Sequence, residues 1–176
     1  MKNLYFWFKN AAEKVSSAAS DSNTLGYLWA QQAYLKAPNA DSWDAFGTKI
    51  AIDADTAVVG SQAEDSIQQT ITNATTASAD NSAPDAGAAY VFVRSGTTWT
   101  QEAYLKAPNT EVQVTGTETN DQFGAHVDLT DGTGTTLIVG TPYDNSNQTT
   151  ITNGSTASTD NSLLASGAAY IFYRGP

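Results

Sequence analysis

"GAAYVFVR" at residues 87–94 returns at residues 167–174 as "GAAYIFYR". Three further pairs of stretches accompany this pair, in the same order along the chain. They are "DAFGTKIAID" (44–53) with "DQFGAHVDLT" (121–130), "TAVVGS" (56–61) with "TLIVGT" (136–141), and "TITNATTASADNS" (70–82) with "TITNGSTASTDNS" (150–162). Repetition of this kind is typical of folds built from stacked copies of one unit. The chain therefore contains two copies of one structural unit.

Alternating apolar and polar residues predict short β-strands in each unit. A continuously apolar stretch, as at 56–60, is expected of a strand buried on both faces. The tetrapeptide "SGTT" (95–98) predicts a tight hairpin between the third and fourth strands, and Pro108 ends the fourth. In the first unit the predicted strands lie at 46–52, 56–60, 89–93 and 99–106.

Four short antiparallel strands per repeat are the arrangement of a propeller blade. The Phe-Gly pairs, "VVGS" with "IVGT", and the two Tyr-x-Phe strands also resemble the FG-GAP repeat, the blade of integrin-α-type β-propellers and of many bacterial surface proteins. The resemblance covers about residues 27–174. It implies an all-β fold with two four-stranded blades. The Gly-Ala-Pro-like triplets of that family read "GSQ" (60–62) and "GTP" (140–142) here, so only the second comes close. A two-sheet sandwich is the alternative.

The end of the repeat also stands near the start of the chain: "WAQQAYLKAPN" (29–39) duplicates "WTQEAYLKAPN" (99–109). The chain then consists of a spare fourth strand (27–38), a full blade (44–108) and a blade without its fourth strand (121–174). Two blades cannot close a ring, because propellers have about four to eight.

We therefore expect residues 27–38 of one copy to complete the second blade of a neighbouring copy, which would hide an exposed strand edge. Such a head-to-tail contact gives a ring or a filament. The alternative is that the chain is a fragment of a longer propeller. The residues expected at the interface are Trp29, Ala33, Leu35, Tyr170 and Phe172.

Residues 1–26 break the β pattern and form a separate N-terminal segment. Their apolar residues follow helical spacing, which predicts a short amphipathic helix from about Asn3 to Ala19, followed by a linker. The helix could pack on its own propeller, among helices of neighbouring copies, or on a membrane surface. In the assembly interpretation the apolar stripe adds Leu4, Trp7, Phe8 and Val15 to the interface.

Charge and composition exclude several function classes. The net charge of −10 argues against nucleic acid, whose phosphates need Lys and Arg. The chain has no cysteine, which removes thiol catalysis and disulfides. The single histidine, His126, is expected to point outward from a strand, and no phosphate loop or nucleophile motif is present. We expect a protein that is not an enzyme.

Calcium is the one cofactor that the resemblance raises, because FG-GAP blades often carry an Asp-rich loop between their first two strands. The two loops here offer fewer carboxylates than a full calcium site needs, and turn residues are the alternative interpretation. The candidate ligands are Asp53, Asp55, Asp128 and Asp131.

The long loops at 62–86 and 142–166 contain three triplets that fit the N-glycosylation pattern, at Asn73, Asn147 and Asn153. Together these features predict an extracellular or cell-surface structural subunit that polymerises head to tail by strand complementation. The alternative is a calcium-dependent adhesion module that binds a glycan or a protein.

Overall fold

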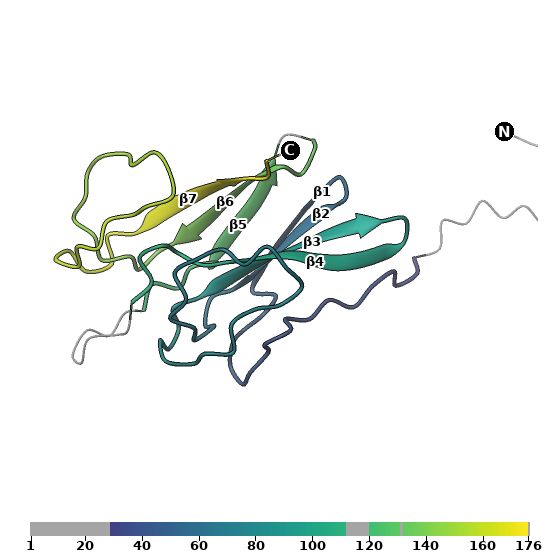
Figure 1. The fold of residues 1–176 in the computed structure, drawn as a ribbon, viewed down its shortest axis with the longest axis horizontal. Coiled ribbons are helices and arrows are strands. Elements are labelled where there is room, and N and C mark those ends of the chain that lie inside the picture. The colour runs from purple at the N-terminus through teal and green to yellow at the C-terminus, as the bar shows by residue number, and fades with distance from the viewer. Residues whose placement is uncertain (1–28, 112–119, 131, 176) are drawn as a thin grey trace, which may run out of the picture. The chain divides into compact units, whose positions relative to one another are not determined.

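The computed structural model describes residues 29–111, 120–130 and 132–175. The described part of residues 32–176 is one compact unit with two antiparallel sheets (Figure 1). The first sheet has the order β1-β2-β3-β4 and the second the order β5-β6-β7. The strands are β1 (Lys49–Asp53), β2 (Thr56–Ser61), β3 (Ala88–Ser95), β4 (Thr98–Leu105), β5 (His126–Thr130), β6 (Thr136–Thr141) and β7 (Ala168–Tyr173).

Both sheets are meanders, in which each strand pairs with the next one along the chain. The pairing of the first sheet is repeated in the second: Val59 lies opposite Tyr90, and Val139 lies opposite Tyr170. The duplicated sequence thus forms duplicated structure. The order and register are consistent with propeller blades and agree with the predicted all-β fold.

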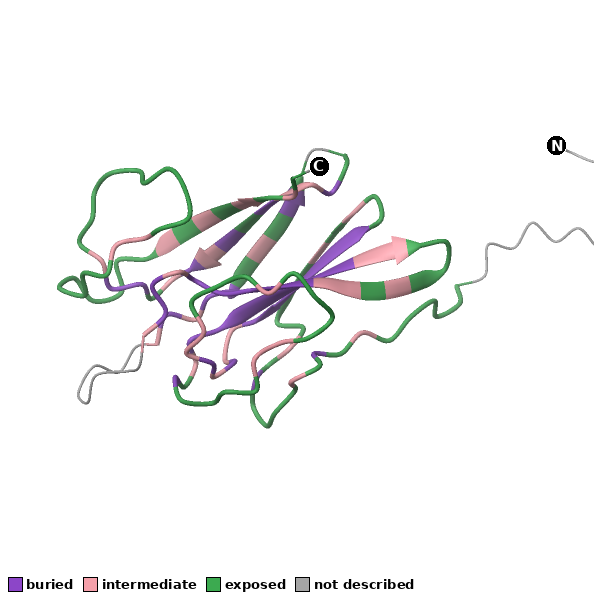
Figure 2. Cartoon of the chain, viewed as in Figure 1, coloured by how far each residue is buried: buried purple, intermediate pink, exposed green. Residues whose placement is uncertain are grey.

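The predicted strands of the first unit are confirmed, with shifts of a few residues at their ends. All six residues of β2 are buried, as its continuous apolar sequence indicates (Figure 2). The hairpin between β3 and β4 pairs Ser95 with Thr98. Gly96 in this hairpin has a φ of 61°, a left-handed conformation that glycine adopts without steric cost.

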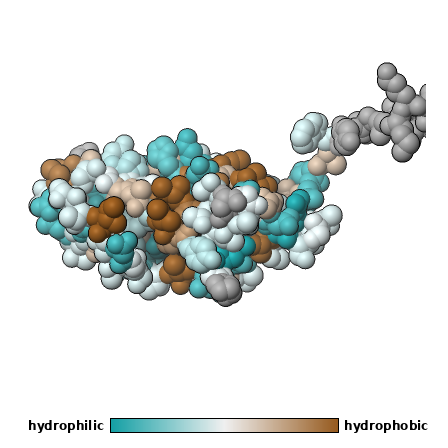
Figure 3. Space-filling model, turned by 90° about the horizontal axis from the view of Figure 1, so that it is seen from above, coloured by the Kyte–Doolittle hydropathy of each residue, from teal (hydrophilic) through white to brown (hydrophobic). Residues whose placement is uncertain are grey.

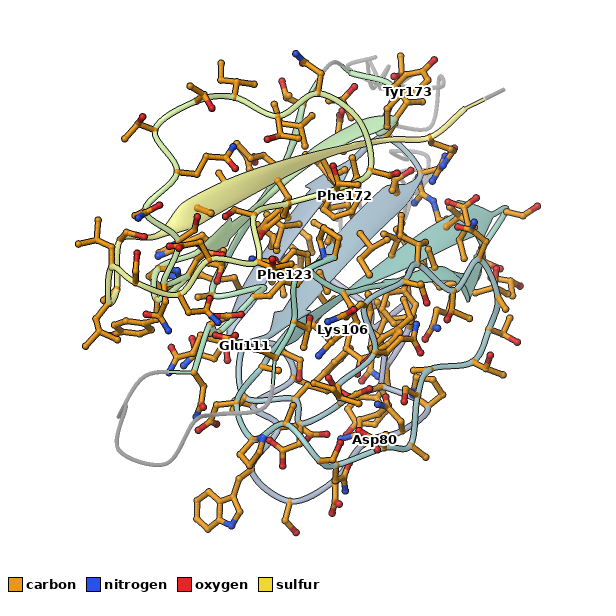
Figure 4. All side chains as sticks on the ribbon, turned by 60° about the vertical axis from the view of Figure 1, so that its left-hand side comes forward. Asp80, Lys106, Glu111, Phe123, Phe172 and Tyr173 are labelled. Atoms are coloured by element: carbon orange, nitrogen blue, oxygen red, sulfur yellow. The ribbon has the colours of Figure 1, made fainter. Side chains whose placement is uncertain are left out.

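A shared hydrophobic core joins the two sheets. Val58, Val91 and Leu105 contribute from the first sheet, while Phe123, Leu137 and Val139 contribute from the second. Figure 4 shows Phe123 and Phe172 in this interior.

The backbones of the two sheets approach closely at one point. A Cβ atom on Gly60 of β2 would lie 2.1 Å from the backbone oxygen of Gly124, so a larger residue at position 60 would push the sheets apart. Nearby, Gly87 and Phe123 form a parallel β-bridge, and the amide of Phe123 donates to the carbonyl of Ala86 at 3.0 Å. The Phe-Gly pair of the second unit is therefore built into the first sheet.

Two predictions about the N-terminal part have different outcomes. Of the predicted fourth strand at 27–38, the described residues 29–38 form no regular strand. A strand needs a partner edge, and the sheet edge that this segment is expected to match belongs to the second unit. The predicted helix at 3–19 lies outside the described residues, and within the described ranges no helix could span a membrane.

Candidate assembly interface

β7 is an open edge of the second sheet. It pairs with β6 along one side, and among the described residues no strand pairs with its other side. Its counterpart β3 pairs on both sides, with β2 and β4. A cavity of about 390 Å³ lies between β4 and β7, with Leu105, Leu137 and Phe172 in its walls. A fourth strand beside β7 would extend over this cavity.

The segment 32–39 contacts the first unit as residues 102–109 contact the second. Leu35 and Ala37 pack with the hydrophobic cluster on the outer face of the first sheet. Leu105 and Ala107 pack with the core around the second unit. The segment 32–39, which we call the displayed segment, is therefore already attached to its own first blade, and at its N-terminal end the indole of Trp99 donates to Oε1 of Gln32 at 2.8 Å.

An asparagine network holds that attachment. The Asn39 amide donates to Oε1 of Glu64 at 3.0 Å and to the carbonyl of Ser78 at 2.6 Å. Its Oδ1 accepts from the hydroxyl of Tyr90 at 2.8 Å. Burial raises the pKa of Tyr90 far above its ordinary value, so this hydroxyl stays a neutral donor.

The second unit repeats the network with Asn109. Its amide donates to Oδ2 of Asp144 at 2.8 Å and to the carbonyl of Ser158 at 3.0 Å. The hydroxyl of Tyr170 donates to Oδ1 of Asn109 at 2.7 Å. The "APN" ending of each copy is thus bound to the unit that follows it.

Tyr34 and Lys36 of the displayed segment lack the environment of their duplicates. Tyr34 is 78% exposed, whereas its counterpart Tyr104 on β4 is 0% exposed. Lys36 is also exposed, while Lys106 is buried. The same sequence is a buried strand in one place and an exposed segment in the other. The difference lies in the presence of a sheet edge.

Apolar residues on the outer faces of the two units are exposed, whereas their counterparts on the faces between the units are buried. Ile171 of β7 is 74% exposed and its counterpart Val91 is 5% exposed. On the opposite outer face, Ile52 of β1 is 66% exposed and its counterpart Leu129 is 8% exposed. Brown patches mark exposed apolar residues on one face of the molecule in Figure 3. The outer face of each unit therefore carries the counterparts of residues on one side of the contact between the two units.

A buried ion pair completes the first blade. Lys106 Nζ lies 2.9 Å from Oε2 of Glu64 and donates to the carbonyl of Gly87 at 2.6 Å. The side chains of Lys106 and Glu64 are at most 1% exposed. Burial lowers the pKa of Lys106, and the charge of Glu64 opposes that shift. A pair this deep in the protein is stable only with both partners and their hydrogen bonds in place.

Within the described ranges, the second unit has the acid of this pair without a lysine. Asp144 stands at the position of Glu64 and is buried, and none of the ion pairs found among the described residues includes it. Asp121 nearby is also buried. Burial, together with the charges of Asp144 and Glu111, raises the pKa of Asp121 to about 7. Asp121 and Asp144 are therefore two neighbouring buried acids, and the charge of Lys106 opposes the rise in the pKa of Asp121.

The structure places the predicted interface residues in different settings. Tyr170 and Phe172 lie on β7 and both stack edge-on against Phe123, at 5.5 and 6.0 Å between ring centroids. Trp29 is exposed and Leu35 is half-buried in the displayed segment, which also contains Ala33. The predicted residues Leu4, Trp7, Phe8 and Val15 lie outside the described residues.

The candidate calcium ligands are engaged separately. Asp55 forms an ion pair with Arg94 at 2.6 Å, and Asp53 accepts from the amide of Gly134 at 3.2 Å. Asp128 accepts from the next amide in the chain, and Asp131 lies outside the described residues. In the described part of the chain no group of three or more acidic or histidine side chains is arranged to hold a metal ion.

The remaining sequence candidates are on the surface. Asn73, Asn147 and Asn153 are all exposed, and so is His126. The amide of Asn147 donates to the hydroxyl of Ser162 at 2.7 Å. The three candidate glycosylation sites are thus accessible to solvent.

Residues 29–92 match the FG-GAP repeat family. The chain carries an FG-GAP repeat. This FG-GAP unit begins at Trp29, in the segment before β1, and ends within β3. By the internal duplication, residues 99–172 form a second copy with the same boundaries. Neither the curated proteins nor the solved structures include a significant match to the chain.

Sequence reasoning missed the polar residues that join the two repeats within the chain. Glu64, Lys106 and Asn109 carry the buried contacts, and none of them was singled out. One pattern could have identified them: "LKAPN" places a lysine directly after an apolar strand in both copies. A charge at that position needs a buried partner, and an acid stands at the same place in both units.

Proposed function

We propose that this FG-GAP protein is a structural subunit that assembles head to tail, with the displayed segment of one copy forming the fourth strand of the second blade of the next. The observation that carries the proposal is the open edge of β7 in a chain that also contains a duplicate of β4. Backbone hydrogen bonds along such an edge supply affinity, and alternate side chains supply register.

The register follows from the first blade. There Tyr90 lies opposite Tyr104 and Ala89 lies opposite Leu105. The equivalent pairs between copies are Tyr170 with Tyr34 and Ala169 with Leu35. In this register Tyr34 enters the cavity between β4 and β7, as Tyr104 is buried in the first blade.

The exposed outer faces support the same arrangement. When the displayed segment of one copy pairs with β7 of another, the first blade of the donating copy lies next to the second blade of the other, because Asn39 binds the segment to its own first blade. Ile171 of the one copy then faces Ile52 of the next, which repeats the internal contact between the two sheets. One geometric operation relates successive blades within and between copies, and it closes into a ring or continues as a filament.

The low-charge, Thr-rich surface and the three accessible Asn-x-Ser/Thr triplets favour a location outside the cell. There the subunit would contribute to a fibre or surface layer. The three asparagines lie in the loops at 62–86 and 142–166. Asn147 and Asn153 are not among the residues that line the cavity between β4 and β7, whereas Asn73 is, so a glycan on Asn73 would stand next to the strand edge.

The deciding experiment measures molar mass by light scattering over a range of protein concentrations for three chains. The intact chain and a chain lacking residues 1–26 should both form species larger than a monomer, because both keep the displayed segment. A chain lacking residues 1–38 should remain monomeric. An intact chain that stays monomeric at every concentration would overturn the proposal and favour a binding module.

A peptide with the sequence of residues 29–39 gives a test that leaves the chain intact. It should occupy β7 and reduce the mass of the assemblies, while a peptide of the same composition in scrambled order should not. Electron microscopy of the intact chain then distinguishes rings from filaments.

A further inference from the structure

Asp144 occupies the position in the second blade that Glu64 occupies in the first, where Glu64 pairs with Lys106. Oε2 of Glu64 accepts from the amide of Ser66 at 3.2 Å and from Lys106 Nζ at 2.9 Å. Oδ1 of Asp144 accepts from the amide of Ser146 at 3.0 Å, which is the same contact in the second blade. No lysine or arginine donates to Asp144 among the described residues.

The second acceptor of the lysine is duplicated as well. Lys106 donates to the carbonyl of Gly87, the residue immediately before β3. Gly167 stands immediately before β7, and its amide donates to the carbonyl of Asp144 at 2.9 Å, as the amide of Gly87 donates to the carbonyl of Glu64 at 2.8 Å. Both acceptors of a lysine ammonium are therefore present in the second blade.

Asp121 adds negative charge to the same place. Its residue is 7% exposed, and the charge of Asp144 contributes to the raised pKa of Asp121. Two buried carboxylates close together are costly, and a nearby cation reduces that cost.

We propose that Lys36 of one copy inserts between Asp144 and the carbonyl of Gly167 of the next copy, and that this buried ion pair sets the register of the strand complementation. The inference rests on the proposed assembly and names the contact that makes it specific. Lys36 is the residue of the displayed segment that corresponds to Lys106, and it is exposed in the single chain. A strand shifted by one residue would point the lysine to the other face of the sheet and leave Asp144 unpaired.

The binding test compares the intact chain with Lys36→Gln, which removes the charge and keeps most of the length. Association between copies should weaken by about 100-fold, because the substitution leaves the buried Asp144 without its cation. Lys49→Gln is the matched control, since Lys49 is an exposed lysine on β1. It should assemble as the intact chain does.

A contact test uses a water-soluble carbodiimide, which joins an amine and a carboxylate only when they touch. Equal amounts of ¹⁴N- and ¹⁵N-labelled chains are mixed, cross-linked and digested. A mixed-isotope peptide that joins Lys36 to Asp144 is expected.

The outcomes separate the two proposals. Assembly of Lys36→Gln with unchanged affinity, or inter-copy cross-links from Lys36 that avoid Asp144, would overturn the lysine contact and leave strand complementation standing. A monomeric intact chain would remove both.

Discussion

The two blades of this protein have nearly the same strands, and they differ in what closes them. The first blade has four strands and a lysine buried against Glu64. In the part of the chain that the structure describes, the second has three strands, an acid that no lysine pairs with and an open edge at β7. Figure 2 shows the result as burial along most of β3 and an alternation of half-buried and exposed residues along its counterpart β7. The sequence of a blade determines its strands, and its neighbours determine whether its core is sealed.

The largest effect should come from the buried lysine of the first blade. Lys106→Ala leaves Glu64 buried without its cation, which should lower the free energy of unfolding by about 3–5 kcal/mol. Lys36→Ala at the duplicate position should change the stability of the monomer by less than about 0.5 kcal/mol, because Lys36 is exposed. Urea unfolding of dilute protein measures both. Equal losses would contradict the difference between the blades.

The phenylalanines of the two Phe-Gly pairs give a second matched comparison. Phe123 is 0% exposed between the units, and Phe123→Ala should destabilise the protein by about 3–4 kcal/mol. Phe46 stacks on Tyr90 at 5.3 Å but is only half-buried. Phe46→Ala should cost about 1–2 kcal/mol, so the thermal midpoint should fall further for the first variant.

Glycines at the same place in β2 and β6 should tolerate alanine differently. Gly60→Ala places a methyl group 2.1 Å from a backbone oxygen, whereas Gly140→Ala meets only the His126 side chain, at 3.2 Å. The first should cost about 2–3 kcal/mol and the second less than about 1 kcal/mol. A similar tolerance at both positions, in chemical denaturation, would mean that the two sheets separate at little cost.

The smallest effect concerns pH and Asp121. Its pKa of about 7 in the folded chain lies above the ordinary value of 3.8, so the folded state binds the proton more tightly than the unfolded state. The stability that this provides is lost as the pH rises towards and through 7.

The thermal midpoint of dilute protein should therefore fall between pH 5 and pH 8. Asp121→Asn should reduce that fall, and a fall of the same size in this variant would assign it to other groups. Asp80 and Asp160 have their pKa values lowered by hydrogen bonds, so their contribution changes below this range.

The strands could be predicted because alternation and duplication are local properties of the sequence. The state of residues 29–38 could not be predicted, because a strand forms only beside an available sheet edge. The free edge that this segment matches is β7, which belongs to the second blade and not to the first blade that the segment contacts. The Lys106–Glu64 pair joins residues far apart in the sequence. Its position was encoded by the duplicated lysine and acid, but its burial follows from packing that the sequence does not display.

Asn109 has a consequence for how the chain unfolds. It lies four residues after the end of β4 of the first blade, yet its side-chain amide and carbonyl oxygen are bound within the second blade. Neither blade can open fully without breaking these bonds, so nearest-neighbour coupling of the kind found in repeat proteins links the two. The pair of blades should therefore melt as one cooperative unit, and amide protons of β2 and β6 should exchange with solvent at similar rates.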